Sequence, residues 1–208
     1  PFGTAGSGSG TNDSPLGTNR VYVDCGDEFS PARWWEGLDA GQVFVTNGPL
    51  LRPTVEGQPP GYVFHIVEKG PLELEIGLSL ATRVKVDYLQ IIKDGSVEQE
   101  VRLDKFAEAG GKLPPLEFAD SGWFLVRAVS NNMQNYQFAA SGPYYVERAG
   151  QRRVSRASVK FFLDWIDAAE ARIRGLQDID EPLREKLLAE QASARGFFAD
   201  LWASASAD

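Results

Sequence analysis

The sequence has little of what most metal and acid–base sites require. It holds one histidine, His65, and one cysteine, Cys25, among 208 residues. No disulfide can therefore form within the chain, and a site that needs several imidazoles cannot be built from this chain alone. His65 stands in a strand-like run, which favours a satisfied or solvent-facing side chain over a ligand. An autonomous serine or acid–base hydrolase would need His65 and a carboxylate in one cleft, and that alternative stays open.

Long apolar runs and excess basic charge are also missing. The apolar stretches fall short of the roughly 18 residues that span a bilayer, so we expect no membrane insertion. The chain has 21 Lys and Arg against 29 Asp and Glu, a net charge of −8. Such a charge repels phosphates, so we expect no nucleic-acid partner. The composition leaves the compartment open between cytoplasm and periplasm.

The first part of the chain divides into two segments. Residues 1–19 are rich in Gly, Ser, Thr and Asn, which predicts a linker or a residual loop of an upstream domain. Residues 20–55 predict a strand, a helix capped by Ser30 and Pro31, and a second strand. Because the chain starts at Pro1 and its only methionine is Met133, we expect it to begin inside a longer gene product.

Residues 56–150 are strand-rich. Five aliphatic residues alternate from Leu72 to Leu80, which puts them on one face of a strand. A change of phase predicts a bulge or a bend near Asp87 and Tyr88, and Asp94-Gly95 predicts a tight hairpin turn. Further strands are expected at 62–68, 122–130, 136–140 and 143–147. This pattern predicts an antiparallel β-sandwich of immunoglobulin-like size.

Residues 151–208 predict a helical hairpin. Apolar residues recur every three or four positions after Ser155, which is expected to cap the first helix, and Gly175 marks the end of that helix. Asp180 caps a second helix. The predicted fold class is therefore α+β and mainly β. It consists of an immunoglobulin-like sandwich with an N-terminal strand-helix-strand segment and a C-terminal αα-hairpin.

Two groups of residues are candidates for ligand binding. Trp34 and Trp35 could stack on sugar rings, although neighbouring helical residues point about 100° apart, which favours one of them in the core. Asn131, Asn132 and Asn135 lie in an amide-rich loop that suits hydroxyl-rich ligands. Together they predict, as one alternative, a module that binds carbohydrate or another small ligand.

Several runs resemble the closing segment of metallohydrolases of the polymerase and histidinol phosphatase type, especially the CehA/McbA group. The resemblance covers about residues 5 to 150. The runs are Leu16-Gly17-Thr18-Asn19-Arg20-Val21-Tyr22-Val23, Phe44-Val45-Thr46-Asn47-Gly48-Pro49-Leu50, Ile91-Ile92-Lys93-Asp94-Gly95, Ser121-Gly122-Trp123 and Ser141-Gly142-Pro143-Tyr144-Tyr145-Val146.

The resemblance implies that residues 20–55 end a barrel domain whose metal ligands lie upstream. This chain would then be a non-catalytic accessory region that packs on or gates the upstream domain, with no cofactor of its own. In metal-binding members an Asp and a His stand where this chain has Gly8 and Gly10. A divalent metal in the full-length parent therefore stays open, and the resemblance favours an exported parent.

Overall fold

The computed structural model describes residues 4–6, 16–67, 69–83, 85–130 and 136–206. The chain forms two compact units, residues 1–152 and residues 153–208. The first unit contains all the strands of the described part, and the second is helical. The fold is thus mixed α and β with a mostly antiparallel sheet, as the sequence predicts. The boundary expected near residue 55 falls inside the first unit.

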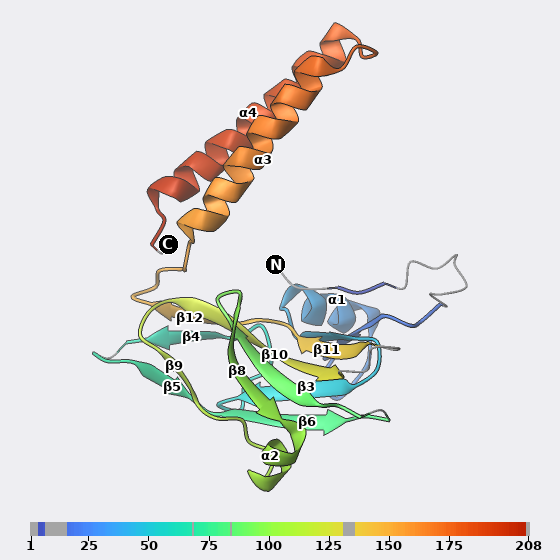
Figure 1. Cartoon of the computed structure of the whole chain (residues 1–208), viewed down its shortest axis with the longest axis vertical. Coiled ribbons are helices and arrows are strands. Elements are labelled where there is room, and N and C mark those ends of the chain that lie inside the picture. Colours follow the sequence, from blue (N-terminus) through green and yellow to red (C-terminus); the bar gives the residue numbers. More distant parts are fainter. Residues whose placement is uncertain (1–3, 7–15, 68, 84, 131–135, 207–208) are drawn as a thin grey trace. The chain divides into compact units, whose positions relative to one another are not determined.

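The first unit is built from short strands and two helices within the described residues (Figure 1). Its elements are β1 (Arg20–Val23), α1 (Pro31–Asp39), β2 (Val43–Thr46), β3 (Leu50–Val55), β4 (Val63–Ile66), β5 (Leu72–Leu74), β6 (Ile76–Ala81), β7 (Tyr88–Lys93), β8 (Ser96–Arg102), α2 (Leu103–Glu108), β9 (Leu116–Phe118), β10 (Gly122–Ser130), β11 (Gln137–Ser141) and β12 (Tyr144–Arg148).

One large sheet and two small ones make up this unit. The large sheet has eight strands: β10 pairs with β7 on one side and with β11 and β12 on the other. β2 and β1 extend it beyond β11, and β4 joins β12 in parallel. β3 pairs with β6, and β5 pairs with β9. β1 and β2 therefore belong to the same sheet as β11. This pairing explains why residues 20–46 belong to the same compact unit as the later strands.

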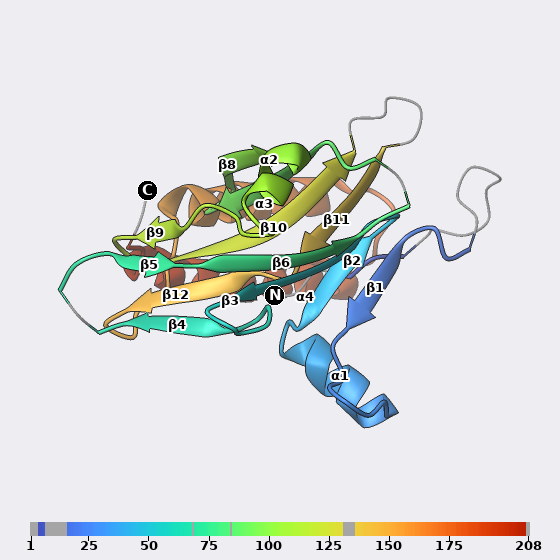
Figure 2. The same cartoon turned by 90° about the horizontal axis from the view of Figure 1, so that it is seen from below.

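The core lies between the large sheet and the two small ones. Figure 2 shows β5 and β6 crossing in front of β10 and β11. Fully buried side chains come from both layers, among them Leu51 of β3, Ile76 of β6 and Phe124 of β10. The aliphatic row that the sequence predicts from Leu72 to Leu80 packs on this core. It is divided into β5 and β6, because the first part pairs with β9 and the second with β3.

The hairpin and bulge predictions have different outcomes. The Asp94-Gly95 turn joins β7 and β8 with φ values of 52° and 94°, as a type I′ turn requires, so this prediction is confirmed. Of the bulge or bend predicted near Asp87 and Tyr88, the bulge is wrong, because β7 starts at Tyr88 and the register shift lies between Ile91 and Ile92.

Tyr144 ties the two layers together. Its ring is fully buried and stacks on Phe124 with centroids 5.1 Å apart. Its hydroxyl donates to the carbonyl oxygens of Pro53 at 3.0 Å and Gln58 at 3.3 Å. Burial raises the pKa of the Tyr144 phenol well above its ordinary value. One side chain of the large sheet thus satisfies backbone acceptors of the facing segment.

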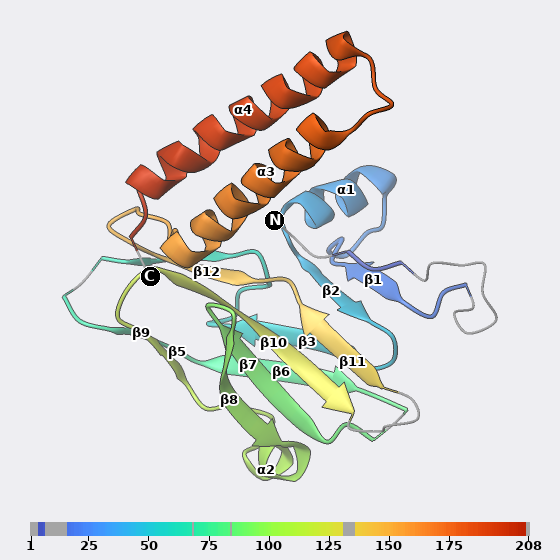
Figure 3. The ribbon, with the colours of Figure 1, turned by 45° about the horizontal axis from the view of Figure 1, so that its top comes forward.

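The second unit is an αα-hairpin of α3 (Arg156–Gly175) and α4 (Glu181–Ala203), which run antiparallel in Figure 3. The hydroxyl of Ser155 accepts from the Ser158 amide at 3.2 Å, and Asp180 accepts from the Leu183 amide at 2.8 Å. Both predicted caps are confirmed. α3 buries Val159 and Ile166.

Candidate functional site

The strand-helix-strand segment builds one wall of a cleft. The Ser30 hydroxyl caps α1 by accepting from the Arg33 amide at 3.2 Å. At the other end of α1, Gly37 packs against the end of β1. A Cβ atom at Gly37 would lie 2.3 Å from the carbonyl oxygen of Asp24, so only glycine allows this approach. The contact fixes α1 beside β1.

The cleft lies between this segment and β3 and has a volume of about 520 Å³. Aliphatic side chains, aromatic rings and prolines make up most of its walls, with a few polar groups. Tyr22 of β1 and Phe44 of β2 stack with centroids 4.8 Å apart. The lining residues include Tyr22, Asp24, Cys25, Phe29, Val43, Phe44, Leu50, Arg52, Pro59 and Pro60. A wall of this composition suits an apolar or aromatic surface.

The polar groups of the cleft are few and come from both walls. The Asp24 carboxylate accepts from the Gly26 amide at 2.9 Å. The half-buried Cys25 thiol donates to the carbonyl of Val23 at 3.6 Å. Arg52 of β3 brings a guanidinium from the opposite side. The cleft can therefore hold a partner through apolar contact and orient it with one charge of each sign.

Aromatic side chains also remain exposed on this segment. Phe29, at the mouth of the cleft, is 75% exposed, and Trp35 on α1 is 60% exposed. The Trp34 and Trp35 rings meet edge to face at 4.8 Å, and Trp34 is half-buried. Neither tryptophan is among the buried core residues, so the expectation that one of them lies in the core is wrong.

Asn131, Asn132 and Asn135 lie outside the described residues, so their role in ligand binding stays a prediction. Tyr136, the next described residue, is fixed at the carboxyl end of β2, where the Asn47 side-chain amide donates to the Tyr136 carbonyl at 3.0 Å. α1, which carries Trp34 and Trp35, precedes the amino end of the same strand.

His65 lies on the open surface of β4. Its Nδ1 is 3.8 Å from Oε2 of Glu147 on the neighbouring strand, and its side chain is 59% exposed. Glu147 also pairs with Arg152 at 3.2 Å. The Glu147 carboxylate thus contacts His65 and Arg152 at the surface of the sheet. The hydrolase alternative stays a prediction.

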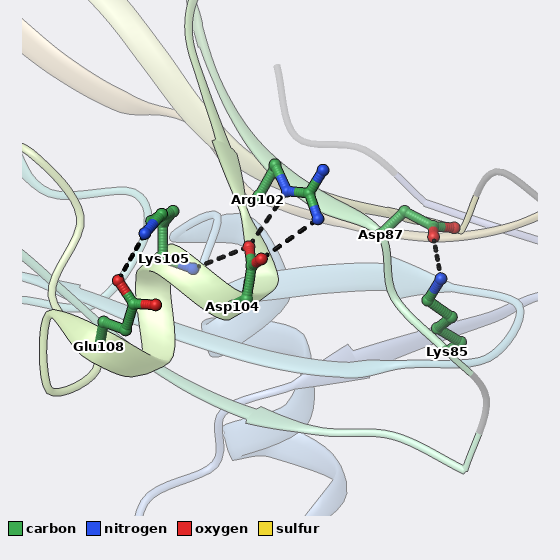
Figure 4. A network of polar contacts seen from close by, with 6 residues as sticks. All are labelled: Lys85, Asp87, Arg102, Asp104, Lys105 and Glu108. Carbon is green, nitrogen blue, oxygen red and sulfur yellow. Dashed lines mark hydrogen bonds and ion pairs between the residues drawn. The ribbon is translucent and has the colours of Figure 1, made fainter.

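A second group of charged residues lies at the junction of β7, β8 and α2 (Figure 4). Lys85 pairs with Asp87 at 3.1 Å, and Arg102 binds both carboxylate oxygens of Asp104. The hydrogen bond from Arg102 lowers the pKa of Asp104, and the same bond raises the pKa of Arg102. These pairs satisfy one another at the surface, so we assign them a structural role.

Within the described residues, no group of three or more His, Cys, Asp and Glu side chains could hold a metal ion. Gly8 and Gly10 lie outside the described part. Among the described helices, none has the length and apolar character needed to cross a membrane.

Sequence reasoning missed half of the cleft. β3 was not expected, so Arg52 had no assigned place, and Pro59-Pro60 was not considered. The paired prolines were the one signal available, because a rigid turn after a strand often lines a binding surface. Comparisons with family models, curated proteins and solved structures find no match.

Proposed function

We propose that this chain is a non-catalytic accessory region of a larger metallohydrolase that resembles the CehA/McbA group, and that it packs on or gates the upstream domain. The observation that carries the proposal is the ring- and proline-lined cleft beside β1. Exposed apolar patches with a polar rim are typical of interaction sites. Here the patch lies on the segment that the resemblance assigns to the end of a barrel domain.

The chemistry of the cleft supports an upstream protein domain as its partner. Phe29 and Trp35 offer large apolar surface, and aromatic side chains dominate the energy of protein interfaces. Asp24 and Arg52 add one charge of each sign on opposite walls, which selects a complementary surface rather than a purely apolar one. A site of this kind fits an interface between domains of one polypeptide.

We also propose that the first unit is an immunoglobulin-like sandwich carrying the strand-helix-strand segment at its edge. In support, β3, β5, β6 and β9 lie on one side of the core, and β8, β7, β10, β11, β12 and β4 on the other. Two packed sheets around one core are typical of that fold. The segment then joins the sandwich through β2 and β11.

Cys25 offers a direct test of this proposal, because it is the only cysteine of the chain and it lines the cleft. In the complete polypeptide encoded by the gene, we expect a maleimide to label Cys25 about 10-fold more slowly than in the 208-residue chain, since burial limits thiol access. Peptide mass mapping identifies the labelled residue.

A matched control places a cysteine at Ser96, which is exposed at the start of β8, in a Cys25→Ser background. Its labelling rate should be the same in both proteins. Equal rates at Cys25 in the two proteins would contradict the proposal. Detection in native cells of a polypeptide of only 22.8 kDa, the mass of this chain, would also contradict it.

The carbohydrate alternative is carried by Trp35 alone among the described residues. Its exposed ring could stack on a sugar. A divalent metal in the parent stays a prediction of the resemblance.

A further inference from the structure

A continuous row of aromatic rings crosses both helices of the C-terminal hairpin. Its members are Trp165, Phe161 and Phe162 of α3 and Phe198 and Phe197 of α4. Successive centroids in the row are 6.2, 5.4, 4.9 and 5.3 Å apart. Phe161 and Trp165 are each 62% exposed, and Phe197 is 60% exposed. We call these five side chains the aromatic row.

The ion pairs of the hairpin lie away from the aromatic row. Arg195 of α4 pairs with Asp167 and, at 3.2 Å, with Glu170 of α3. Asp167 lies about 160° around α3 from Trp165, and Arg195 lies about 160° around α4 from Phe197. The hairpin therefore has two different faces. One face carries paired charges, and the other carries aromatic rings that are exposed in the described part of the chain.

We propose that the aromatic row is the interface of a homodimer, in which the hairpins of two chains form a four-helix bundle. The exposed parts of Phe161, Phe162, Trp165, Leu183 and Phe197 amount to on the order of 500 Å² of apolar surface. A specific dimer buries about 800 Å² on each partner. The row together with Leu183 thus supplies most of one side of such an interface.

The hairpin is also self-complementary in charge. Phe161, Trp165, Ala168 and Arg172 follow one another at four- and three-residue steps, so Arg172 shares the face of the row. Glu190 lies two turns from Phe197 and shares the corresponding face of α4. No ion pair is found for Arg172 or Glu190 within the described part of the chain.

The positions of Arg172 and Glu190 along the hairpin axis determine which symmetry of the dimer pairs them. The Arg195–Asp167 ion pair shows which positions of the antiparallel helices lie level with each other. Arg172 follows Asp167 by five residues and Glu190 precedes Arg195 by five, so they are also level. A two-fold axis along the hairpin places α3 opposite α4 of the second copy, so that rings meet rings and Arg172 meets Glu190 of the second copy.

The charge balance of the hairpin favours another copy of itself. Residues 153–208 carry eight Lys and Arg and ten Asp and Glu, whereas residues 1–152 carry 13 and 19. The hairpin is therefore close to neutral, and two copies repel each other little. This inference does not depend on the function proposed above.

The first test measures the mass of the full chain by light scattering during gel filtration. We expect a particle of twice 22.8 kDa at micromolar concentration. Trp165→Glu would bury a charge in the interface and should raise the Kd of the dimer about 100-fold or more. Ala192→Glu is the matched control, because exposed Ala192 lies about 140° around α4 from Phe197. The control should remain dimeric, and circular dichroism should show both variants folded.

The second test separates contacts between chains from contacts within one chain. Arg172→Glu and Glu190→Arg each place like charges opposite one another in the homodimer, which should weaken it about 10-fold. A mixture of the two single variants restores both opposite-charge pairs, so it should form a one-to-one heterodimer with close to wild-type affinity.

Three outcomes would overturn the proposal. The first is a wild-type chain that remains monomeric at micromolar concentration, even if another partner covers the aromatic row. The second is a dimer that Trp165→Glu leaves intact. The third is a mixture of the single variants that stays monomeric while the double variant in one chain dimerises, because the pair would then act within one hairpin.

Discussion

The two units of the chain solve the problem of burying apolar surface in different ways. The sheet unit encloses a core between its layers, with large side chains such as Phe118, Phe124 and Tyr144 fully buried. The hairpin buries Val159 and Ile166 on α3, and on α4 no residue is fully buried. Helices gain most of their stability from packing an apolar face. The hairpin therefore depends on association more than the sheet unit does.

The polar contacts of the hairpin do not compensate for this difference. Its ion pairs, such as Lys160 with Asp164 and Arg174 with Glu170, join side chains that are largely exposed on at least one side. Exposed pairs contribute about 0.2 to 1 kcal/mol each. The apolar rings of the row offer much more once they are covered, so covering them is the larger source of stability.

The largest expected effect comes from opening the core of the sheet unit. Phe124→Ala removes a fully buried ring that contacts Phe118 and Tyr144, and it should cost about 4 kcal/mol. For a unit of this size we expect the midpoint of its thermal transition to fall by about 10 °C. Scanning calorimetry measures the shift.

The matched substitution in the other unit is Ile166→Ala, which should lower the transition of the hairpin and leave that of the sheet unit in place. Circular dichroism at the helical band follows the hairpin. If either variant shifts both transitions equally, the two units unfold together and the contrast between them fails.

A smaller effect is expected from the hydroxyl that joins the layers of the sheet unit. Tyr144→Phe keeps the stacked ring but leaves the Pro53 carbonyl without its donor, which should cost about 1 to 2 kcal/mol at pH 7. Denaturant titration measures this loss.

The same hydroxyl gives a pH dependence with a defined sign. Because burial raises the pKa of Tyr144 in the folded state, its contribution is complete below about pH 10, the value in the unfolded chain, and is lost as the pH rises above it. The wild type should lose stability between pH 9 and 11 more steeply than Tyr144→Phe. If the stabilities of the wild type and Tyr144→Phe fell in parallel with rising pH, the burial of the Tyr144 hydroxyl would be contradicted.

Local signals in the sequence predicted most elements of both units. Ser30, Ser155 and Asp180 mark helix starts because a cap acts within a few residues, and Asp94-Gly95 marks its turn for the same reason. The strand at 122–130 was predicted with its observed bounds.

The elements that were missed depend on distant partners. β3 contains Arg52-Pro53, which is unusual for a strand, and it forms because it lies at an edge beside β6. β9 has three residues and exists through its pairing with β5. The cleft was missed with β3, since this unpredicted strand forms one of its two walls.

The smallest effect is expected at the surface ion pairs of the sheet unit. Asp104→Asn removes the carboxylate that Arg102 binds, but both side chains are exposed, so the midpoint of unfolding should hardly change at pH 7. The sign of its pH dependence is still defined. Because Arg102 lowers the pKa of Asp104, the contribution of this pair is present above about pH 4, the value for an unfolded chain, and disappears as the pH falls below it. Wild type and variant should therefore differ slightly at pH 7 and coincide at pH 2 in denaturant titrations. A loss at pH 7 as large as that of Tyr144→Phe would mean that the charged junction of β8 and α2 stabilises the unit as strongly as its buried core contacts.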